Sequence, residues 1–361
     1  MRLSVPSTGI YTQVVIIGAG QAGLAVAYFL KRFELEPGVD FIIYDRGPGT
    51  GGAWQRRWDG LRLGSAHHVS DLPGMSELGI SFDTADRTLP AKDIVAGYYR
   101  RYEDHFALNV QRPVTVQRVI NRGADLVVQH DAGETTTRVI VNATGTWGAP
   151  FIPYYPGANT FSGRHVHTNG YMSAEEFAGQ RVVVVGGGTS AVGFLLELEG
   201  VASELTWASR RPIEFKDESE LTIEGGVAAV AAQDQAARAG SALPSIVSGT
   251  GIPRTRRIAA GIERGVLVAR PIFSSIEPDG VRWPDGTFTT ADAIIWATGF
   301  RPELRHLAPL HLREKAGGLT VEHGAAWVDP RIFLAGYGPT ASTIGANRAG
   351  RVIARQIMAQ L

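Results

Sequence analysis

One arrangement occurs twice in this chain: a short run of β-branched residues followed at once by a glycine-rich turn. Val14–Ile17 leads into Gly18-Ala-Gly20-Gln-Ala-Gly23, and Val182–Val185 leads into Gly186-Gly-Gly188-Thr-Ser-Ala191. An apolar run of this length is typical of a buried strand, and the glycines of a turn that opens a helix. Glycine is needed there because a dinucleotide pyrophosphate must approach backbone N–H groups at a helix N-terminus. The repetition predicts an α/β protein with two dinucleotide-binding, Rossmann-like domains.

The first unit is complete. A helix is expected over Leu24–Phe33 and a second strand over Phe41–Tyr44, which ends in Asp45, about 22 residues after Gly23. An acid at that distance suits a ribose hydroxyl, although a solvated strand end is the alternative. Small residues in later loops suit close approach to a ligand. The residues predicted to bind the first dinucleotide are Gly18, Gly20, Gln21, Ala22, Gly23, Asp45, Arg46, Gly52, Trp54, Thr144, Gly145 and Gly336.

The second unit differs where its second strand ends. The strand Leu205–Ala208 runs into Ser209-Arg-Arg211, where the first unit has an acid. Arginine suits a 2′-phosphate, so this site is expected to prefer NADPH, with NADH possible; a solvated arginine pair is the alternative. The residues predicted to bind NADPH are Gly186, Gly188, Thr189, Ser190, Ala191, Ser209, Arg210, Arg211, Ala297, Thr298 and Gly299.

The remaining patterns organise the chain around these units. Lys92–Phe106 reads as an amphipathic helix whose core stripe is Ile94, Tyr98, Tyr102 and Phe106, spaced four apart. Two small antiparallel β-meanders are predicted, one from the segments 114–120, 126–130 and 139–142, the other around the turns 278–280 and 284–286. A C-terminal helix is expected over 344–361. The segment 212–265 has no clear pattern and could be a helical insertion, a lid or a substrate loop.

Composition excludes several classes of protein. The chain has 361 residues, no cysteine and a formal net charge of zero. Without cysteine, disulfide reductase chemistry and thiolate metal sites are excluded, and zero net charge gives no argument for nucleic acid. No metal site is predicted, because no acidic cluster accompanies His67 and His68. No apolar run approaches the roughly 18 residues of a membrane span, and with no visible export signal we expect a cytoplasmic protein.

Taken together, these motifs resemble the flavin-containing monooxygenases of the short bacterial kind. The resemblance runs from Tyr11 to about Gln356 and places the motifs in the family's order: Gly18–Gly23 with Asp45, Gly51-Gly-Ala-Trp54, Phe161-x-Gly163-x-x-x-His167-x-x-x-Tyr171, Gly186–Ala191 and Ala297-Thr-Gly-Phe300. It implies FAD at the first turn and NADPH at the second. The predicted limits are 11–160 and 300–361 for the FAD domain, 172–299 for an inserted NADPH domain, and 161–171 for a linker that carries the family motif.

The resemblance also implies an activity. NADPH would reduce FAD, a flavin hydroperoxide would form with O2, and a soft S or N of a small organic substrate would take one oxygen atom. Tyr171 stands where Baeyer–Villiger enzymes have Trp, which favours S or N over ketones. Baeyer–Villiger oxygenation, a flavin electron-transfer reductase and an inactive nucleotide sensor are the alternatives. No catalytic residue is assigned; His167 and Tyr171 are predicted to lie at the domain joint. A homodimer is possible, and no membrane or nucleic-acid partner is expected.

Overall fold

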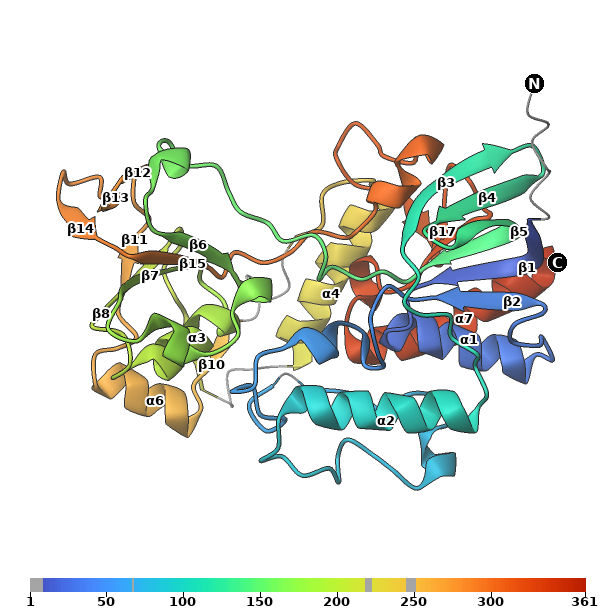
Figure 1. Ribbon diagram of the computed structural model, residues 1–361, viewed down its shortest axis with the longest axis horizontal. Helices are drawn as coiled ribbons and strands as arrows, with labels where there is room; N and C mark the ends of the chain where they lie inside the picture. Colours follow the sequence, from blue (N-terminus) through green and yellow to red (C-terminus); the bar gives the residue numbers. More distant parts are fainter. Residues whose placement is uncertain (1–8, 67, 218–222, 245–250) are drawn as a thin grey trace.

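The computed structural model describes residues 9–66, 68–217, 223–244 and 251–361. Within these ranges the chain forms two lobes: the first is built on a mixed sheet whose central strands are parallel, and the second on a parallel sheet (Figure 1). The first sheet contains strands from both ends of the sequence, and the second contains only strands between residues 164 and 296. The second lobe is therefore inserted into the first, as the two glycine turns predicted.

The first sheet has eight strands. The path β16-β17-β18-β5-β1-β2 is extended by β3 and β4, which form an antiparallel meander with β5. Its central strand β1 is parallel to both β2 and β5, and Val14–Ile17 at its end are buried. The strands are β1 (Ile10–Ile17), β2 (Phe41–Tyr44), β3 (Val116–Arg122), β4 (Asp125–His130), β5 (Gly133–Asn142), β16 (Val321–Glu322), β17 (Ala325–Ala326) and β18 (Ile332–Leu334).

Helices α1 (Gln21–Arg32) and α7 (Thr343–Gln360) pack against each other beside the first sheet (Figure 1). They approach closely because Gly350 has no side chain: a Cβ there would lie 2.9 Å from the backbone carbon of Ala25. Ile353 and Ile357 of α7 share a buried cluster with Leu24 of α1. The C-terminal helix was expected, and it completes the core on which the first glycine turn rests.

Helix α2 (Ala91–His105) was predicted within one residue at each end, but its core stripe was placed too far to one side. Val95, Tyr99 and Tyr102 are fully buried, whereas Ile94 and Tyr98 are only partly covered. The physical reason is the period of the helix. Residues spaced strictly four apart drift by about 40° per step around a helix of 3.6 residues per turn, so a core face alternates steps of three and four.

The second sheet runs in the order β11-β8-β7-β15-β6, with all neighbours parallel. Helices α3 (Thr189–Leu198) and α6 (Arg256–Glu263) belong to this lobe (Figure 1), and the predicted meander β12-β13-β14 lies beside it. The strands of this part of the chain, which include the separate pair β9 and β10, are β6 (Arg164–His167), β7 (Arg181–Val185), β8 (Glu204–Ser209), β9 (Phe215–Lys216), β10 (Ile252–Pro253), β11 (Ala269–Pro271), β12 (Ser275–Glu277), β13 (Gly280–Arg282), β14 (Phe288–Thr290) and β15 (Ala293–Trp296).

Two segments depart from the predicted division of the chain. The segment 161–171, expected to be a linker, contributes the edge strand β6, because its backbone pairs with β15. The helix α4 (Ile223–Arg238), which lies within 172–299, packs instead against η8 (Gly338–Thr340) and β16 of the first lobe. Part of the segment 212–265 is therefore a helical insertion that reaches across to the other lobe. Residues 218–222 and 245–250 lie outside the described ranges.

Two of the backbone segments that run between the lobes are paired with each other. Pro150 and Phe300 form an antiparallel bridge, the Phe151 amide donates to the Gly299 carbonyl at 3.0 Å, and the Arg301 amide donates to the Ala149 carbonyl at 2.8 Å. We call residues 143–151 and 297–303 the crossing segments. Because each fixes the other, the joint is a short two-stranded ribbon and not two independent tethers.

A tryptophan of the first lobe adds a second connection. Trp58 follows the short helix η1 (Gly52–Arg56), yet its ring is 5% exposed and lies in the core cluster of the second lobe. It packs at 5.1 Å from Phe194 and 5.9 Å from Tyr171, and its Nε1 donates to the carboxylate of Glu197 at 2.8 Å. Trp58 thus anchors one lobe in the interior of the other.

Removing this anchor should destabilise the protein. Trp58→Ala deletes a buried aromatic ring and leaves Glu197 short of a donor, so we expect the free energy of unfolding to fall by about 3–5 kcal/mol. Urea denaturation followed by circular dichroism measures it. The matched control is Trp327→Ala, because Trp327 is 69% exposed, and a surface change should stay within about 0.5 kcal/mol. Equal losses for the two variants would contradict the anchoring role of Trp58.

Candidate functional site

A cavity of about 430 Å³ lies where strands β1, β2 and β5 end, next to the first crossing segment. Of the residues predicted to bind the first dinucleotide, all except Gly23 line it. These are Gly18, Gly20, Gln21, Ala22, Asp45, Arg46, Gly52, Trp54, Thr144, Gly145 and Gly336. Segments separated by more than three hundred residues in the sequence therefore meet around one space, at the carboxyl edge of the sheet.

The glycines of the first turn allow backbones to pass one another closely. A Cβ on Gly18, whose φ is +106°, would lie 2.5 Å from the Ala143 carbonyl oxygen. A Cβ on Gly23 would lie 1.9 Å from the carbonyl oxygen of Gly18, which explains why Gly23 supports the turn from behind and does not line the cavity. A Cβ on Gly52 would come within 2.8 Å of the Gly20 Cα. Each contact tolerates only glycine, and together they leave a backbone cradle of the kind a pyrophosphate requires.

Asp45 fixes the shape of this cradle. Its carboxylate is 9% exposed, and each oxygen accepts a backbone amide at 2.7 Å, one from Ala19 and one from Gly47. Each carboxylate oxygen has a second lone pair, so Asp45 keeps the capacity to accept a hydroxyl hydrogen from the cavity. Its position beside the turn fits a ribose, and its bonds to both flanking loops also give it a structural function.

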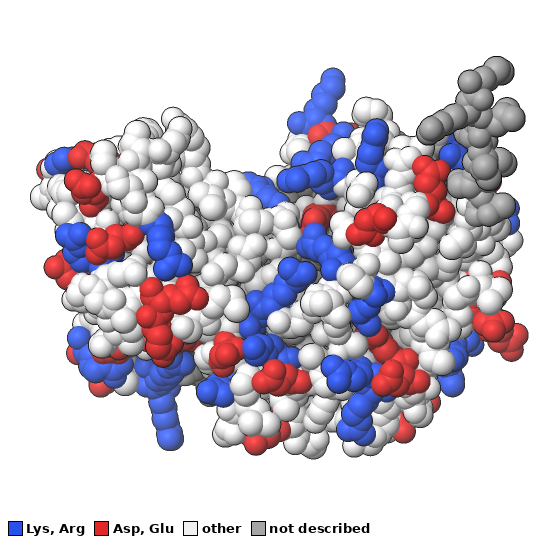
Figure 2. Space-filling model, viewed as in Figure 1, with Lys and Arg blue, Asp and Glu red and all other residues white. Residues whose placement is uncertain are grey.

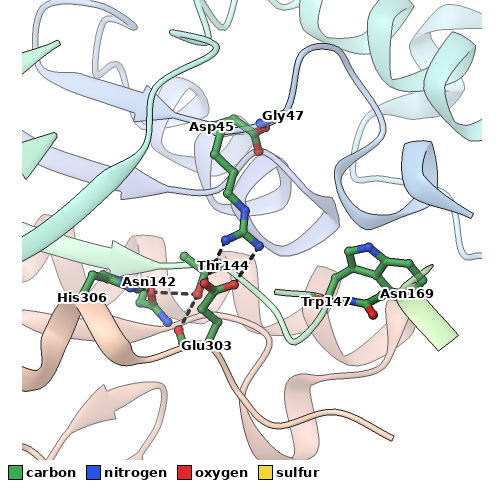
Figure 3. Close-up of polar contacts among 9 residues, drawn as sticks. Asp45, Gly47, Asn142, Thr144, Trp147, Asn169, Glu303 and His306 are labelled. Atoms are coloured by element: carbon green, nitrogen blue, oxygen red, sulfur yellow. Dashed lines mark hydrogen bonds and ion pairs between the residues drawn. The ribbon is translucent and has the colours of Figure 1, made fainter. Parts of the chain in front are cut away.

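Sequence reasoning predicted Arg46 and Thr144 but missed Glu303 and His306 at the far wall of the cavity, where side chains from the two crossing segments meet (Figure 3). Glu303 forms a two-pronged ion pair with Arg46, with both N···O distances 2.8 Å, and its carbonyl oxygen lies 2.7 Å from the Thr144 hydroxyl. His306 donates from Nε2 to the Asn142 side chain at 2.8 Å. Burial lowers the pKa of His306 to about 4, so this ring is neutral at physiological pH. No local motif surrounds Glu303 or His306, and only the fold brings them to the cavity.

The second glycine turn follows the same plan in the other lobe. Gly186 has a φ of +142°, and a Cβ there would lie 2.2 Å from the Ala297 carbonyl oxygen. The indole of Trp207 donates to the Gly186 carbonyl at 2.7 Å. Gly188 precedes the first turn of α3, which contains the predicted residues Thr189, Ser190 and Ala191. Within the described chain, no side chain caps α1 or α3, so both helix starts suit an anion.

The basic residues after β8 are presented to solvent. Ser209 is buried and donates from its hydroxyl to the Arg211 carbonyl at 2.8 Å, which holds the turn at the strand end. Arg210 and Arg211 are exposed, and among the residues that the structure describes neither forms an ion pair. Thr298 differs from its predicted role at the nucleotide: its hydroxyl donates to the Phe151 carbonyl, within the paired crossing segments.

His167 lies at the joint, as its motif position suggested. Its Nε2 donates to the Gly299 carbonyl at 2.9 Å, its Nδ1 accepts from the Asn169 amide at 3.4 Å, and its ring meets Phe300 edge to face at 4.8 Å. Burial lowers the pKa of His167, which favours this neutral tautomer. Asn169 in turn donates to the Trp147 carbonyl at 3.4 Å (Figure 3). His167 thus joins strand β6 to both crossing segments.

Tyr171 lies deeper, in the core of the second lobe. It is 1% exposed, stacks on Phe177 at 5.7 Å, and packs against Phe194 at 4.2 Å. Its hydroxyl donates to Glu197 at 3.2 Å, so this one carboxylate receives Tyr171 and the anchoring Trp58 together. Burial raises the pKa of Glu197 and of Tyr171. The last residue of the family motif therefore acts on the connection between the lobes.

The raised pKa of Glu197 gives a prediction with a defined sign. A carboxyl group whose pKa is raised on folding stabilises the folded state below its unfolded pKa, and that contribution is lost as pH rises through the folded pKa. Glutamine at this position can keep both partners without a charge. The free energy of unfolding of Glu197→Gln minus that of the wild type should therefore increase from pH 4.5 to pH 7.

Urea titrations across that pH range measure this difference. Glu199 supplies a control of opposite sign, because its hydrogen bond to Arg264 lowers its pKa. The stability of Glu199→Gln relative to the wild type should therefore decrease over the same range. A pH-independent difference for Glu197→Gln would show that burial does not affect this carboxylate.

The structure also shows where the remaining features singled out in the sequence lie. Among the described residues, no group of three or more His, Asp or Glu side chains could hold a metal ion. His68 lines a small separate cavity of about 90 Å³, and His67 lies outside the described ranges. Tyr337, which follows Gly336, is buried and accepts the Leu319 amide at its hydroxyl. Within the described residues, no helix combines the length and apolar character needed to cross a bilayer.

Two nucleotide turns in facing lobes, with a cavity at one of them, define a pyridine-nucleotide oxidoreductase fold. In agreement, the profile of the family described as pyridine nucleotide-disulphide oxidoreductase matches residues 15–227. The flavin-containing monooxygenase from Stenotrophomonas maltophilia is 33% identical over 97% of this chain and 99% of its own, with a TM-score of 0.78; a double mutant of it gives 0.81. The chain belongs to the flavin-containing monooxygenases of this larger family.

Curated relatives agree with this assignment. An uncharacterized oxidoreductase, CzcO, from Bacillus velezensis is 30% identical over 56% of each chain. The senecionine N-oxygenase of Tyria jacobaeae is 29% identical over 54% of this chain and 46% of its own. The aligned part thus spans about half the length of these two relatives. Disulfide chemistry, which the name of the larger family includes, is excluded here because the chain has no cysteine.

Proposed function

We propose that this protein is an NADPH-dependent FAD monooxygenase that oxygenates a soft S or N of a small organic substrate. The overall reaction balances as substrate, O2, NADPH and a proton giving oxygenated substrate, NADP⁺ and water. The observation that carries the proposal is the cavity beside the joint, where the first fingerprint meets both crossing segments. The similarity to flavin-containing monooxygenases over nearly the whole chain supports it.

The first lobe, residues 11–160 and 300–361, would hold FAD. The backbone cradle at Gly18–Gly23 suits the pyrophosphate, and Asp45 suits the ribose. When bound, FAD supplies the redox chemistry: it accepts a hydride and activates O2. The protein positions the cofactor and encloses it. The Arg46–Glu303 pair and the buried, neutral His306 form a fixed wall and provide no mobile proton near the cofactor at neutral pH.

The second lobe, within residues 172–299, would hold NADPH. The turn at Gly186 suits the pyrophosphate, and the exposed arginines after β8 suit the 2′-phosphate. Figure 2 shows basic side chains gathered along the middle of the molecule, between the two lobes, where anionic cofactors would approach. The helix α4, which packs on the first lobe, belongs with the FAD side in this division.

Tyr171 supports S or N oxygenation over ketone oxygenation. It stands where Baeyer–Villiger enzymes have Trp, and its hydroxyl donates to Glu197 at 3.2 Å. The name of the senecionine N-oxygenase is consistent with oxygenation at nitrogen. The alternative on this scaffold is Baeyer–Villiger oxygenation, which the similarity to a Baeyer–Villiger monooxygenase of Streptomyces coelicolor favours, at 29% identity over 60% of this chain.

The test uses the FAD-loaded protein with NADPH, ¹⁸O2 and a panel of aryl sulfides, tertiary amines and ketones. We expect sulfoxides or N-oxides that contain one ¹⁸O atom per NADPH consumed, with little hydrogen peroxide. Mass spectrometry of the products and a peroxide assay measure these quantities. Esters from the ketones alone would support the Baeyer–Villiger alternative. NADPH consumption that follows added quinone, with no ¹⁸O in any product, would identify an electron-transfer reductase.

The choice of NADPH gives a separate prediction. Arg210→Ala removes a charge-assisted contact with the 2′-phosphate, worth roughly 1–3 kcal/mol, so the KM for NADPH should rise roughly 5- to 100-fold. The KM for NADH, which lacks this phosphate, should change little. Steady-state oxidation of each nucleotide measures both values. Arg256→Ala, at an exposed arginine at the start of α6, is the matched control, and equal effects of Arg210→Ala on the two nucleotides would remove Arg210 from the phosphate site.

A further inference from the structure

Arg57 lines the cavity at the side that faces the joint. It follows η1, the short helix that begins at the Gly51–Gly52 turn beside the first fingerprint. The carbon of its guanidinium group lies 4.2 Å from the ring centre of Trp147 and 5.5 Å from that of Trp54. Both indoles are 7% exposed. A positive charge therefore lies between two largely buried aromatic rings, next to the space where the lobes meet.

Within the part of the chain that the structure describes, this charge has no negative partner. Among the described residues, no carboxylate lies within ion-pair distance of Arg57, and its Nε is sealed from solvent without a hydrogen-bond acceptor. Burial lowers the pKa of Arg57 to about 10, which still leaves it protonated at neutral pH. Its neighbours differ: Arg46 is fully paired with Glu303, and Arg56 is exposed.

An arrangement of this kind favours an anion. A buried cation is costly unless a counter-charge and hydrogen-bond acceptors replace the water it has lost, and contact with aromatic faces compensates only in part. A guanidinium offers five N–H donors in a rigid fork that matches a carboxylate. The guanidinium group of Arg57, which lines the cavity, is therefore a binding position for an acidic oxygen.

The cofactor phosphates have other places in the proposed layout. Each pyrophosphate has its own glycine cradle, at Gly18–Gly23 or at Gly186–Ala191, and the 2′-phosphate has Arg210. We therefore propose that Arg57 binds the carboxylate of the organic substrate and that Trp147 binds its apolar or aromatic body. This inference rests on the proposed monooxygenase function and adds a substrate class: aryl or other apolar carboxylic acids that carry the group to be oxygenated.

The wall of this site is rigid. Trp147 stacks on Phe300 at 5.0 Å with 23° between the rings, and its carbonyl accepts the amide of Asn169 (Figure 3). Phe300 is in turn contacted edge to face by His167. The aromatic wall against Arg57 is therefore held by both crossing segments, and a carboxylate on Arg57 would point the rest of the substrate along the joint. Arg57 would set specificity and orientation and take no part in proton transfer.

The test separates binding from turnover. Benzoate and benzamide, which have the same shape and differ in charge, are titrated into the oxidised FAD-loaded protein, and the change in flavin absorbance gives the two dissociation constants. We expect benzoate to bind at least about tenfold more tightly than benzamide. Arg57→Ala and Arg57→Gln should abolish that preference, Arg57→Lys should keep part of it, and Arg62→Ala, at an exposed arginine that does not line the cavity, should leave it unchanged.

A turnover arm uses one sulfide in two forms, 4-(methylthio)benzoate and its methyl ester. The wild type should favour the acid in kcat/KM, and Arg57→Gln should lose that preference through KM. Equal binding of benzoate and benzamide by the wild type would overturn the carboxylate assignment, even if Arg57→Ala failed to fold. A variant that loses FAD, or raises the KM for NADPH while keeping the acid preference, would assign Arg57 to a cofactor phosphate. Absence of any oxygenated product would count against the proposed function, whereas the benzoate titration would still decide the site.

Discussion

The pairing of the two crossing segments is the constraint on which the rest of this structure depends. The hydrogen bonds of Phe151 and Arg301 join two backbone passes between the lobes. On one side the ribbon continues into Thr144 and Glu303, which form the cavity wall. On the other it continues into Ala297, whose carbonyl oxygen requires glycine at position 186. A change in the ribbon therefore alters both nucleotide sites at once, which explains why small residues recur at Ala143–Gly145 and Ala297–Gly299.

The family motif at Phe161–Tyr171 contributes to the connection between the lobes and not directly to the chemistry. His167 joins the edge strand β6 to Gly299 as a neutral hydrogen-bonding group, and Tyr171 contributes to the buried carboxylate contact that receives Trp58. Both side chains have their polar atoms engaged within the protein, so neither has a free group to offer a substrate. A sequence signature shared across a family is compatible with such a structural function, because a fixed relation between two cofactors is itself a requirement for hydride transfer.

The sequence predicted those parts of the fold that are determined by residues close together in the chain. A strand, a glycine turn and a helix lie within about thirty residues, so Gly18–Gly23 and Asp45 could be read directly from spacing. Helix α2 was found but its core face was misplaced, because a four-residue spacing only approximates the helical period. Strand β6 and helix α4 were misassigned because pairing and packing across the fold decide them. Glu303 and Arg57 were missed for the same reason. Glu303 is distinguished by its ion pair with Arg46, and Arg57 by the lack of an ion-pair partner among the described residues. Neither feature can be read from neighbouring residues in the sequence.

Two of the arginines that line the cavity, Arg46 and Arg57, are in opposite electrostatic situations, and the difference between them bears on function. Arg46 is neutralised by Glu303 in a two-pronged pair, so it contributes shape and connection to the cavity but little net field. Arg57 keeps its charge in a less polar setting, where the field of an unpaired cation is felt more strongly than at the surface. In the proposed layout, the neutralised pair of Arg46 and Glu303 forms the wall of the first lobe where FAD would lie. The unpaired charge of Arg57 faces the joint, where the substrate would enter.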